Sequence, residues 1–173
     1  DMELEFRLAT IDPFGSATTG ITRTLDLTHE SSDDFAEFFT DEGGHDAWPA
    51  DRYLNIWVHD GANRHGYISV GGKGQAPGNN PLTDGVIIAY QAFGTVPPLA
   101  LEQGLTLGRT GTHEVGHWLG LLHFEAQFNF MKTLVPDEQM LMFEQEQKEQ
   151  IHAVFSTGGG RETMYNNLVE TCD

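Results

Sequence analysis

Alternating apolar and polar positions predict the strands of this chain. Residues 3–9 (ELEFRLA) alternate as a half-buried strand does. Residues 53–58 (YLNIWV), 66–70 (GYISV) and 85–90 (GVIIAY) are runs rich in β-branched and aromatic residues, which favour strands. The stretch GGKGQAPGNNP, which follows residues 66–70, is rich in Gly, Pro and Asn and predicts a loop. We therefore expect a sheet in the first half of the chain.

Apolar residues at helical spacing predict three helices. Ser31 with Asp34 forms a candidate capping box ahead of a short helix that carries the phenylalanines of residues 35–39. A second helix is expected over residues 105–119 and a third over about residues 144–155. The GGGR segment that follows predicts a flexible turn or tail. Strands with one helix, followed by two helices, predict an α+β domain.

Composition narrows the class of protein. The chain has 173 residues and 39% hydrophobic residues, which fit one folded domain over residues 1–173. A net charge of −17 repels phosphate backbones and anionic lipids, so we expect no nucleic-acid partner. No apolar run approaches the roughly 20 residues needed to cross a bilayer, so we expect no membrane insertion. Cys172 is the single cysteine, which excludes an internal disulfide.

The candidate chemistry is concentrated in residues 113–123, HEVGHWLGLLH, which extend HExxH to HExxHxxGxxH. Four residues make about one helical turn, so His113 and His117 project from the same face and suit one metal ion. A continuous helix would carry His123 away from that face. Gly120 is placed to end the helix in a left-handed conformation and let the chain turn back. We predict that His113, His117 and His123 bind Zn²⁺.

Glu114 follows the first histidine and is the candidate general base. From this position it would activate a zinc-bound water for attack on a peptide carbonyl and then protonate the leaving amine. The alternative is three unrelated histidines on an amphipathic helix. The glycine and the third histidine argue against it, because both occur at the spacing that a shared metal site requires. The hypothesis of a domain that binds a metal ion without catalysing a reaction stays open.

The extended motif is that of the metzincin clan of zinc peptidases, and its surroundings resemble the pappalysin family, particularly the ulilysin-like microbial members. The resemblance covers most of residues 4–123 and is carried by FRLAT, DP and GITR within residues 4–24, by YLNIWV, by DGV at residues 84–86, and by GRT at residues 108–110. It implies a secreted or extracytoplasmic protein whose signal segment, and a propeptide, are missing from this chain. We expect a monomer.

The resemblance also implies two subdomains. An upper subdomain, about residues 1–120, would hold a twisted, mostly parallel sheet and the active-site helix. A smaller lower subdomain, about residues 121–173, would hold the methionine turn and a C-terminal helix, with substrate in the cleft between the two. The family's antiparallel edge strand maps to residues 86–90, where an extended peptide would pair. The expected substrate-binding residues are therefore Val86, Ile87, Ile88, Ala89 and Tyr90.

Metzincins place a methionine beneath the metal as an apolar floor. The segment Asn129-Phe130-Met131 resembles the family's Asn-Tyr-Met, so Met131 is expected to fill this role, with Met164 as the alternative. Pappalysins usually have a long segment before this turn, often with cysteines and calcium ligands. Here seven residues separate His123 from Met131, which leaves calcium binding open.

The chain departs from the family just after Met131. The family's tyrosine, thought to help stabilise the transition state, is Thr133 here, and the aspartate before it is Lys132. Tyr165 is an alternative source of that hydroxyl. We expect a zinc-dependent endopeptidase acting on extended polypeptides. Because of this departure, the alternative is a catalytically weak or inactive protein that binds zinc and a peptide or protein partner. Hydrolysis of a non-peptide amide is disfavoured, because the strand-like edge suits an extended chain.

Overall fold

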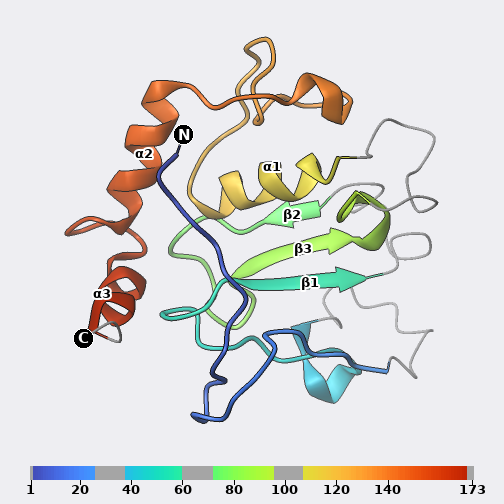
Figure 1. Cartoon of the computed structure of the whole chain (residues 1–173), viewed down its shortest axis with the longest axis vertical. Helices are drawn as coiled ribbons and strands as arrows, with labels where there is room; N and C mark the ends of the chain where they lie inside the picture. The colour runs from blue at the N-terminus through green and yellow to red at the C-terminus, as the bar shows by residue number, and fades with distance from the viewer. Residues whose placement is uncertain (1, 26–37, 60–71, 96–106, 171–173) are drawn as a thin grey trace.

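The computed structural model describes residues 2–25, 38–59, 72–95 and 107–170 (Figure 1). Within these ranges it contains a small sheet, three α-helices and short 3-10 turns: β1 (Asn55–His59), β2 (Gly72–Gly74), β3 (Gly85–Ala89), α1 (Arg109–Trp118), α2 (Gln145–Phe155), α3 (Glu162–Glu170), η2 (Thr40–Glu42), η3 (Tyr90–Ala92) and η4 (Asp137–Gln139). The predicted strand at residues 66–70 lies outside the described residues, and so does most of the predicted helix that follows Ser31.

The described sheet has the strand order β1-β3-β2. The central strand, β3, pairs in parallel with β1 and antiparallel with β2. Every residue of β3 is buried, as expected for an apolar run with neighbours on both edges and both faces. The helix α1 lies along the sheet, and α2 and α3 stand at one end of it (Figure 1). The mixed sheet with its helices confirms the α+β class.

The antiparallel edge strand is β2, so its predicted location at residues 86–90 is wrong. Hydrogen bonds to β1 and β2 occupy the two edges of β3, which leaves Val86, Ile87, Ile88 and Ala89 no free edge for a peptide. Tyr90 begins η3 beyond the strand. The three residues of β2 lie in the stretch predicted to be a loop. The sequence pattern did not predict this strand, because two of its three residues are glycines and glycine is depleted in strands.

The predicted strand at residues 3–9 is also wrong. This segment runs along the molecule without strand pairing (Figure 1). Met2 and Leu4 pack against the core, whereas Phe6 and Leu8 are exposed. Side chains of α2 bind the beginning of the segment, since the His152 ring donates a hydrogen bond to the Met2 carbonyl over 2.8 Å. The alternating pattern is present, but no described strand lies beside it.

Glycines of β2 allow α1 to lie directly against the sheet. A Cβ at Gly72 would come within 2.8 Å of the Glu114 Cγ, and one at Gly74 would overlap the Glu114 carbonyl oxygen. The helix begins at Arg109, later than the predicted residue 105, because Gly108 has the left-handed φ of 67°. The sheet therefore supports α1 at the residue that carries the candidate base.

The C-terminal helix α2 is close to its predicted bounds, and a reciprocal capping box between Glu144 and Gln147 begins it. Of the flexible turn or tail predicted at GGGR, the structure has a turn, and this turn leads into α3, which the sequence did not predict. The Arg161 backbone N–H donates to the Val154 carbonyl, and Arg161 as a whole residue is only 4% exposed. Among the described residues, no helix has the length and apolar character needed to cross a membrane.

We predict that Gly74→Ala destabilises the protein by about 3 kcal/mol or more, at or above the upper end of ordinary overpacking effects, because the new Cβ meets backbone rather than a movable side chain. Urea unfolding of the variant and the parent protein measures the change. Gly111→Ala is the matched control, since its Cβ would meet only side chains at 3.8 Å and 3.9 Å and helical alanine is favoured over glycine by up to about 1 kcal/mol. Equal stability of Gly74→Ala and the parent would contradict the close packing of α1 on β2.

Candidate metal centre

Three histidine rings converge at the end of α1. The candidate ligand atoms of His113, His117 and His123 all lie within 4.8 Å of one another. The Nε2 atoms of His113 and His117 are 3.1 Å apart, close to the roughly 3.3 Å that follows from two zinc–nitrogen bonds of about 2.0–2.1 Å at a tetrahedral angle. The His123 ring centroid lies 4.7 Å from that of His117 and 5.3 Å from that of His113. Three converging nitrogen donors fit a metal ion.

The third ring reaches this position because α1 stops and the chain reverses at Gly120. Gly120 has a φ of 87°, in the left-handed region that glycine adopts freely. The Gly120 N–H donates to the His117 carbonyl over 2.8 Å, and the Leu121 N–H donates to the Gly116 carbonyl over 2.9 Å. These two bonds define a Schellman motif, which ends a helix and redirects the chain. The turn expected at Gly120 is therefore present.

Backbone carbonyls orient the two helical imidazoles. The Nδ1 of His113 lies 2.7 Å from the Phe130 carbonyl oxygen, and the Nδ1 of His117 lies 2.8 Å from the Leu121 carbonyl oxygen. A carbonyl only accepts, so each Nδ1 carries the proton and each Nε2 presents its lone pair. Such outer partners commonly fix the tautomer and the ring orientation of metal-binding histidines.

Burial keeps these imidazoles in the form that binds metal. Burial lowers the pKa of His113 to about 4, against the opposing effect of its hydrogen bond to Phe130, and the neighbouring histidines lower the pKa further. Burial also lowers the pKa of His117. Metal ligation requires a neutral imidazole. In the metal-free site, His113 is therefore ready to bind at neutral pH without losing a proton.

Glu114 follows the ligand candidate His113 on α1, and its carboxylate is bonded to the edge strand. The residue is 7% exposed, and its Oε2 accepts the Gly74 N–H over 2.8 Å. Burial raises the pKa of Glu114 to about 7, with the Gly74 N–H partly opposing the rise. A carboxyl group with a pKa near neutrality can both accept and return a proton in that pH range.

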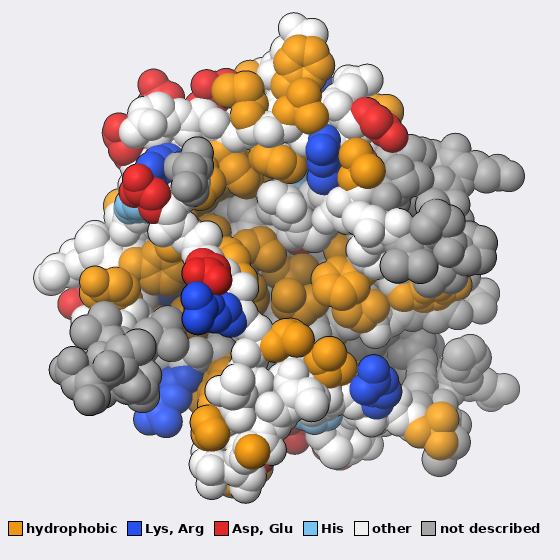
Figure 2. Space-filling model, in the orientation of Figure 1, with side chains coloured by type: hydrophobic (Ala, Val, Ile, Leu, Met, Phe, Trp, Pro, Cys, Tyr) orange, Lys and Arg blue, Asp and Glu red, His pale blue; other side chains and the backbone are white. Residues whose placement is uncertain are grey.

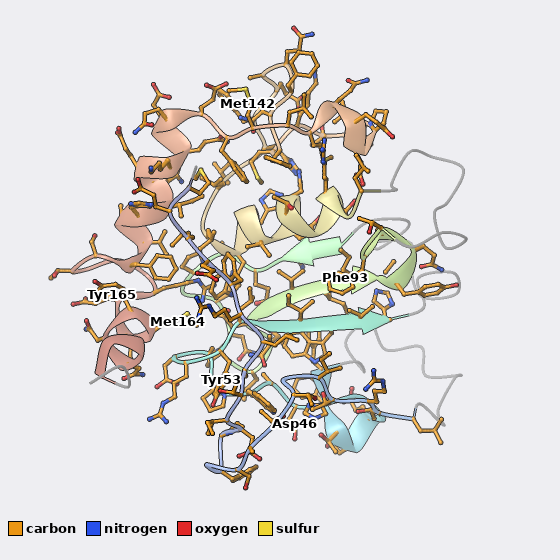
Figure 3. The ribbon with its side chains drawn as sticks, viewed as in Figure 1. Asp46, Tyr53, Phe93, Met142, Met164 and Tyr165 are labelled. Carbon is orange, nitrogen blue, oxygen red and sulfur yellow. The ribbon has the colours of Figure 1, made fainter. Side chains whose placement is uncertain are left out.

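Met131 packs under α1. It is fully buried, and a Cβ at Gly116 would overlap its Sδ. Its carbonyl accepts the N–H of Phe124, the residue after His123, over 2.9 Å. Met164, the alternative, is buried on α3, and Figure 3 places it with that helix, away from the loop that carries Met142.

A buried amide pair holds the turn that carries Met131. The Asn129 side chain accepts the Met131 backbone N–H over 2.8 Å and donates to the Gln147 Oε1 over 2.7 Å. The same Gln147 oxygen accepts the backbone N–H of Glu144 at the start of α2. The turn that carries Met131 is thus joined to α2. The family motif drew attention to Asn129, but nothing in the sequence marked Gln147 as its partner.

Thr133 does not offer a free hydroxyl, because its Oγ1 donates to the Glu125 Oε1 over 2.8 Å. Tyr165 extends from α3 at the outer end of the molecule and is 53% exposed (Figure 3). Its position does not suit it to replace the family's tyrosine near the histidines.

Sequence reasoning missed the residues that bind the two ends of α1. The Asp137 carboxylate accepts the backbone N–H groups of Leu107 and Arg109 at the beginning of the helix. The Arg161 guanidinium donates to the carbonyl of Trp118, the last helical residue, and pairs with Asp84. These partners come from distant parts of the chain, so no local pattern identifies them. Charged residues are rarely fully buried without a partner, so the burial of Asp137 and Arg161 marks them as structurally important. This burial becomes visible only once the fold is known.

No protein-family model matches the chain. Among curated proteins, an extracellular metalloprotease of Verticillium alfalfae is 41% identical over 71 residues. That match spans 41% of this chain but only 23% of the length of the curated relative.

Solved structures of mirolysin match almost the whole chain. Mirolysin in complex with compound 9 has 32% identity and a TM-score of 0.79, covering 95% of this chain and 75% of that one. Mature mirolysin of Tannerella forsythia with a cleaved peptide has 31% identity and a TM-score of 0.80 over the same shares. A promirolysin mutant of that organism has 30% identity and a TM-score of 0.83, covering 98% and 68%. Fold, histidine cluster and relatives agree: the chain belongs to the pappalysin family of metzincin metalloproteases.

Proposed function

We propose that this chain is the catalytic domain of a zinc-dependent endopeptidase that cuts extended polypeptides outside the cytoplasm. The observation that carries the proposal is the convergence of three imidazoles beside a buried carboxylate. The named relatives support it, since one is an extracellular metalloprotease and another was solved with a cleaved peptide. A propeptide in the full-length protein is part of the proposal, supported by the promirolysin relative.

In this proposal His113, His117 and His123 hold the metal. Three imidazole nitrogens without a thiolate or carboxylate suit zinc, and a three-ligand set leaves a position for water. When bound, zinc polarises the scissile carbonyl and lowers the pKa of water to about 7. Calcium is not needed for any of these roles.

Glu114 acts as the base and then as the acid. Its Oε2 is engaged by the Gly74 N–H, so Oε1 is the oxygen that takes the proton of the attacking water. The same carboxyl group returns that proton to the leaving amine, which completes hydrolysis without a net change in the protein. Its raised pKa of about 7 suits both transfers near neutral pH.

The outer edge of β2 is the proposed docking edge for substrate. The Gly74 N–H points away from β3 toward Glu114, and alternation along the strand directs the backbone groups of Gly72 the same way. Among the described strands, none pairs with this edge. The face in Figure 2 is hollowed at its centre, at the level of α1 and the strands, and apolar side chains border the hollow. Substrate would lie there, between an upper subdomain of about residues 1–120 and a lower one of about residues 121–173.

The second candidate is a protein that holds zinc and a peptide without cutting it. The engaged hydroxyl of Thr133, at the position of the family's tyrosine, is the observation that favours it. The two candidates share the metal centre. They differ in whether Glu114 transfers a proton during cleavage of a peptide bond.

The metal centre predicts that His123→Ala loses zinc affinity by more than about 100-fold, because a ligand matters more than the outer partners whose loss typically costs about 10–100-fold. Competition between the apoprotein and a coloured chelator measures affinity, and elemental analysis measures stoichiometry. His45→Ala is the control, since the side-chain contact of His45 is with the neighbouring Asp46 carbonyl. If His123→Ala kept the parent's affinity, the three-histidine assignment would be wrong.

The catalytic role predicts that Glu114→Gln retains zinc but cleaves an unfolded protein substrate about 10²–10⁴-fold more slowly in kcat/KM, the usual range for loss of a positioned acid–base group. Zinc content and cleavage are measured on the same preparations, with a chelator-treated parent as the metal-free reference. Cleavage by Glu114→Gln at the parent's rate would exclude Glu114 as the base. A zinc-loaded parent that binds such substrates without cutting them would favour the second candidate.

A further inference from the structure

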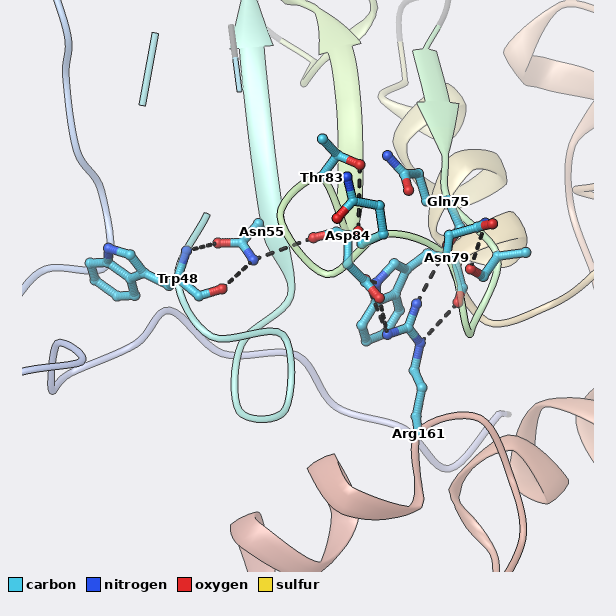
Figure 4. Close-up of polar contacts among 10 residues, drawn as sticks. Trp48, Asn55, Gln75, Asn79, Thr83, Asp84 and Arg161 are labelled. Atoms are coloured by element: carbon cyan, nitrogen blue, oxygen red, sulfur yellow. Dashed lines mark hydrogen bonds and ion pairs between the residues drawn. The ribbon is translucent and has the colours of Figure 1, made fainter. Parts of the chain in front are cut away.

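Arg161 is a buried cation far in sequence from the histidines but bonded to the end of their helix. It lies in the turn between α2 and α3, and its side chain extends to the place where the sheet and α1 meet (Figure 4). Its side chain is 3% exposed, and the side chain of Asp84, its ion-pair partner, is 8% exposed. Burying a charge is costly unless it is paired and hydrogen-bonded, so this arrangement requires a reason.

The guanidinium uses its donors on three partners. Its Nη1 lies 3.1 Å from the Asp84 carboxylate, and its Nη2 donates to the Gln75 carbonyl over 3.4 Å. Its Nε donates to the Trp118 carbonyl over 3.0 Å, while its Cζ lies 3.6 Å above the centre of the Trp118 ring. The Trp118 indole N–H in turn donates to Asp84 over 2.6 Å. One planar cation therefore joins the entry to β3, the exit from β2 and the last residue of α1.

The carbonyl that Arg161 binds belongs to the helix end that creates the metal centre. A helix leaves its last carbonyls without partners inside the helix. Here the Gly116 and His117 carbonyls are bonded within the Schellman turn, and the Gly120 carbonyl accepts the Gln150 side chain. Arg161 supplies the partner for the Trp118 carbonyl. A cation at this position also interacts favourably with the negative end of the helix dipole.

We propose that Arg161 is a positioning residue for the third metal ligand. By fixing the Trp118 carbonyl and ring, Arg161 sets where α1 ends and how the turn at Gly120 directs His123. The proposal rests on the proposed function to the extent that the three histidines hold a metal ion. His113 and His117 lie within the helix, and carbonyls orient their rings, so loss of Arg161 acts chiefly on His123, which is exposed and follows the turn.

The test measures zinc affinity of the apoprotein by chelator competition for the parent, Arg161→Gln and Arg161→Lys, with circular dichroism to establish folding. We expect Arg161→Gln to bind zinc about 10–100-fold more weakly, as for other groups that orient a ligand. Arg161→Lys retains the charge without the planar fork and should recover part of the loss. Arg52→Gln is the matched control, because Arg52 is an exposed arginine distant from α1 in the sequence.

A double-mutant cycle with His123→Ala separates positioning from general stability. If Arg161 acts through His123, Arg161→Gln lowers affinity by less than about twofold once His123 is already absent, because coupled residues are not additive. The absorption spectrum of the cobalt-substituted protein gives a second readout. Arg161→Gln should shift the parent's spectrum toward that of His123→Ala, whereas Arg52→Gln should leave it unchanged.

Several results would overturn the proposal. A folded Arg161→Gln protein that binds zinc within twofold of the parent would do so, as would an equal loss of affinity with and without His123. If neither Arg161 variant folds, the residue serves the whole domain and not the ligand. If His123→Ala itself leaves zinc affinity unchanged, the proposed metal centre fails, and this result is distinguishable because it does not involve Arg161.

Discussion

The position at which α1 ends is the constraint on which the site depends. Two imidazoles one turn apart need only a helix, but the third can join them only if the helix stops and the chain reverses within a few residues. The left-handed Gly120 makes that reversal without steric cost. The Gly116 and His117 carbonyls are bonded within the turn, and the Trp118 and Gly120 carbonyls accept from the side chains of Arg161 and Gln150. The end of the helix is therefore specified as closely as its interior.

The second half of the chain supports both ends of this helix and its lower side. Asp137 binds N–H groups at the beginning of α1, and Arg161 binds a carbonyl at its end. Between them, Met131 packs against Gly116, and the Phe130 carbonyl orients His113. On the other side, the glycines of β2 bring the sheet against Glu114. The helix is thus held on several sides by contacts with both halves of the chain.

Local patterns predicted the parts of the fold whose cause is local. The apolar run of β3, the periodicity of α2 and the reversal at Gly120 depend on neighbouring residues, and these predictions were confirmed. The edge strand was misplaced because Gly72 and Gly74 are selected by the approach of α1, a contact 40 residues away in the case of Gly74 and Glu114. Residues 3–9 have a strand pattern, yet a pattern cannot supply the strand that would pair with them. Arg161 was hidden for the same reason, since its partner Asp84 is 77 residues away.

The Asp84–Arg161 pair also bears on how the chain can be divided. The ion pair and the helix-end bonds cross the proposed border near residue 120 between the two subdomains. A shortened protein ending at that border would leave a carboxylate inside the apolar region without its counter-ion and a tryptophan without its stacked cation. A fragment carrying only the helix with its first two histidines would therefore not be expected to keep its native helix end.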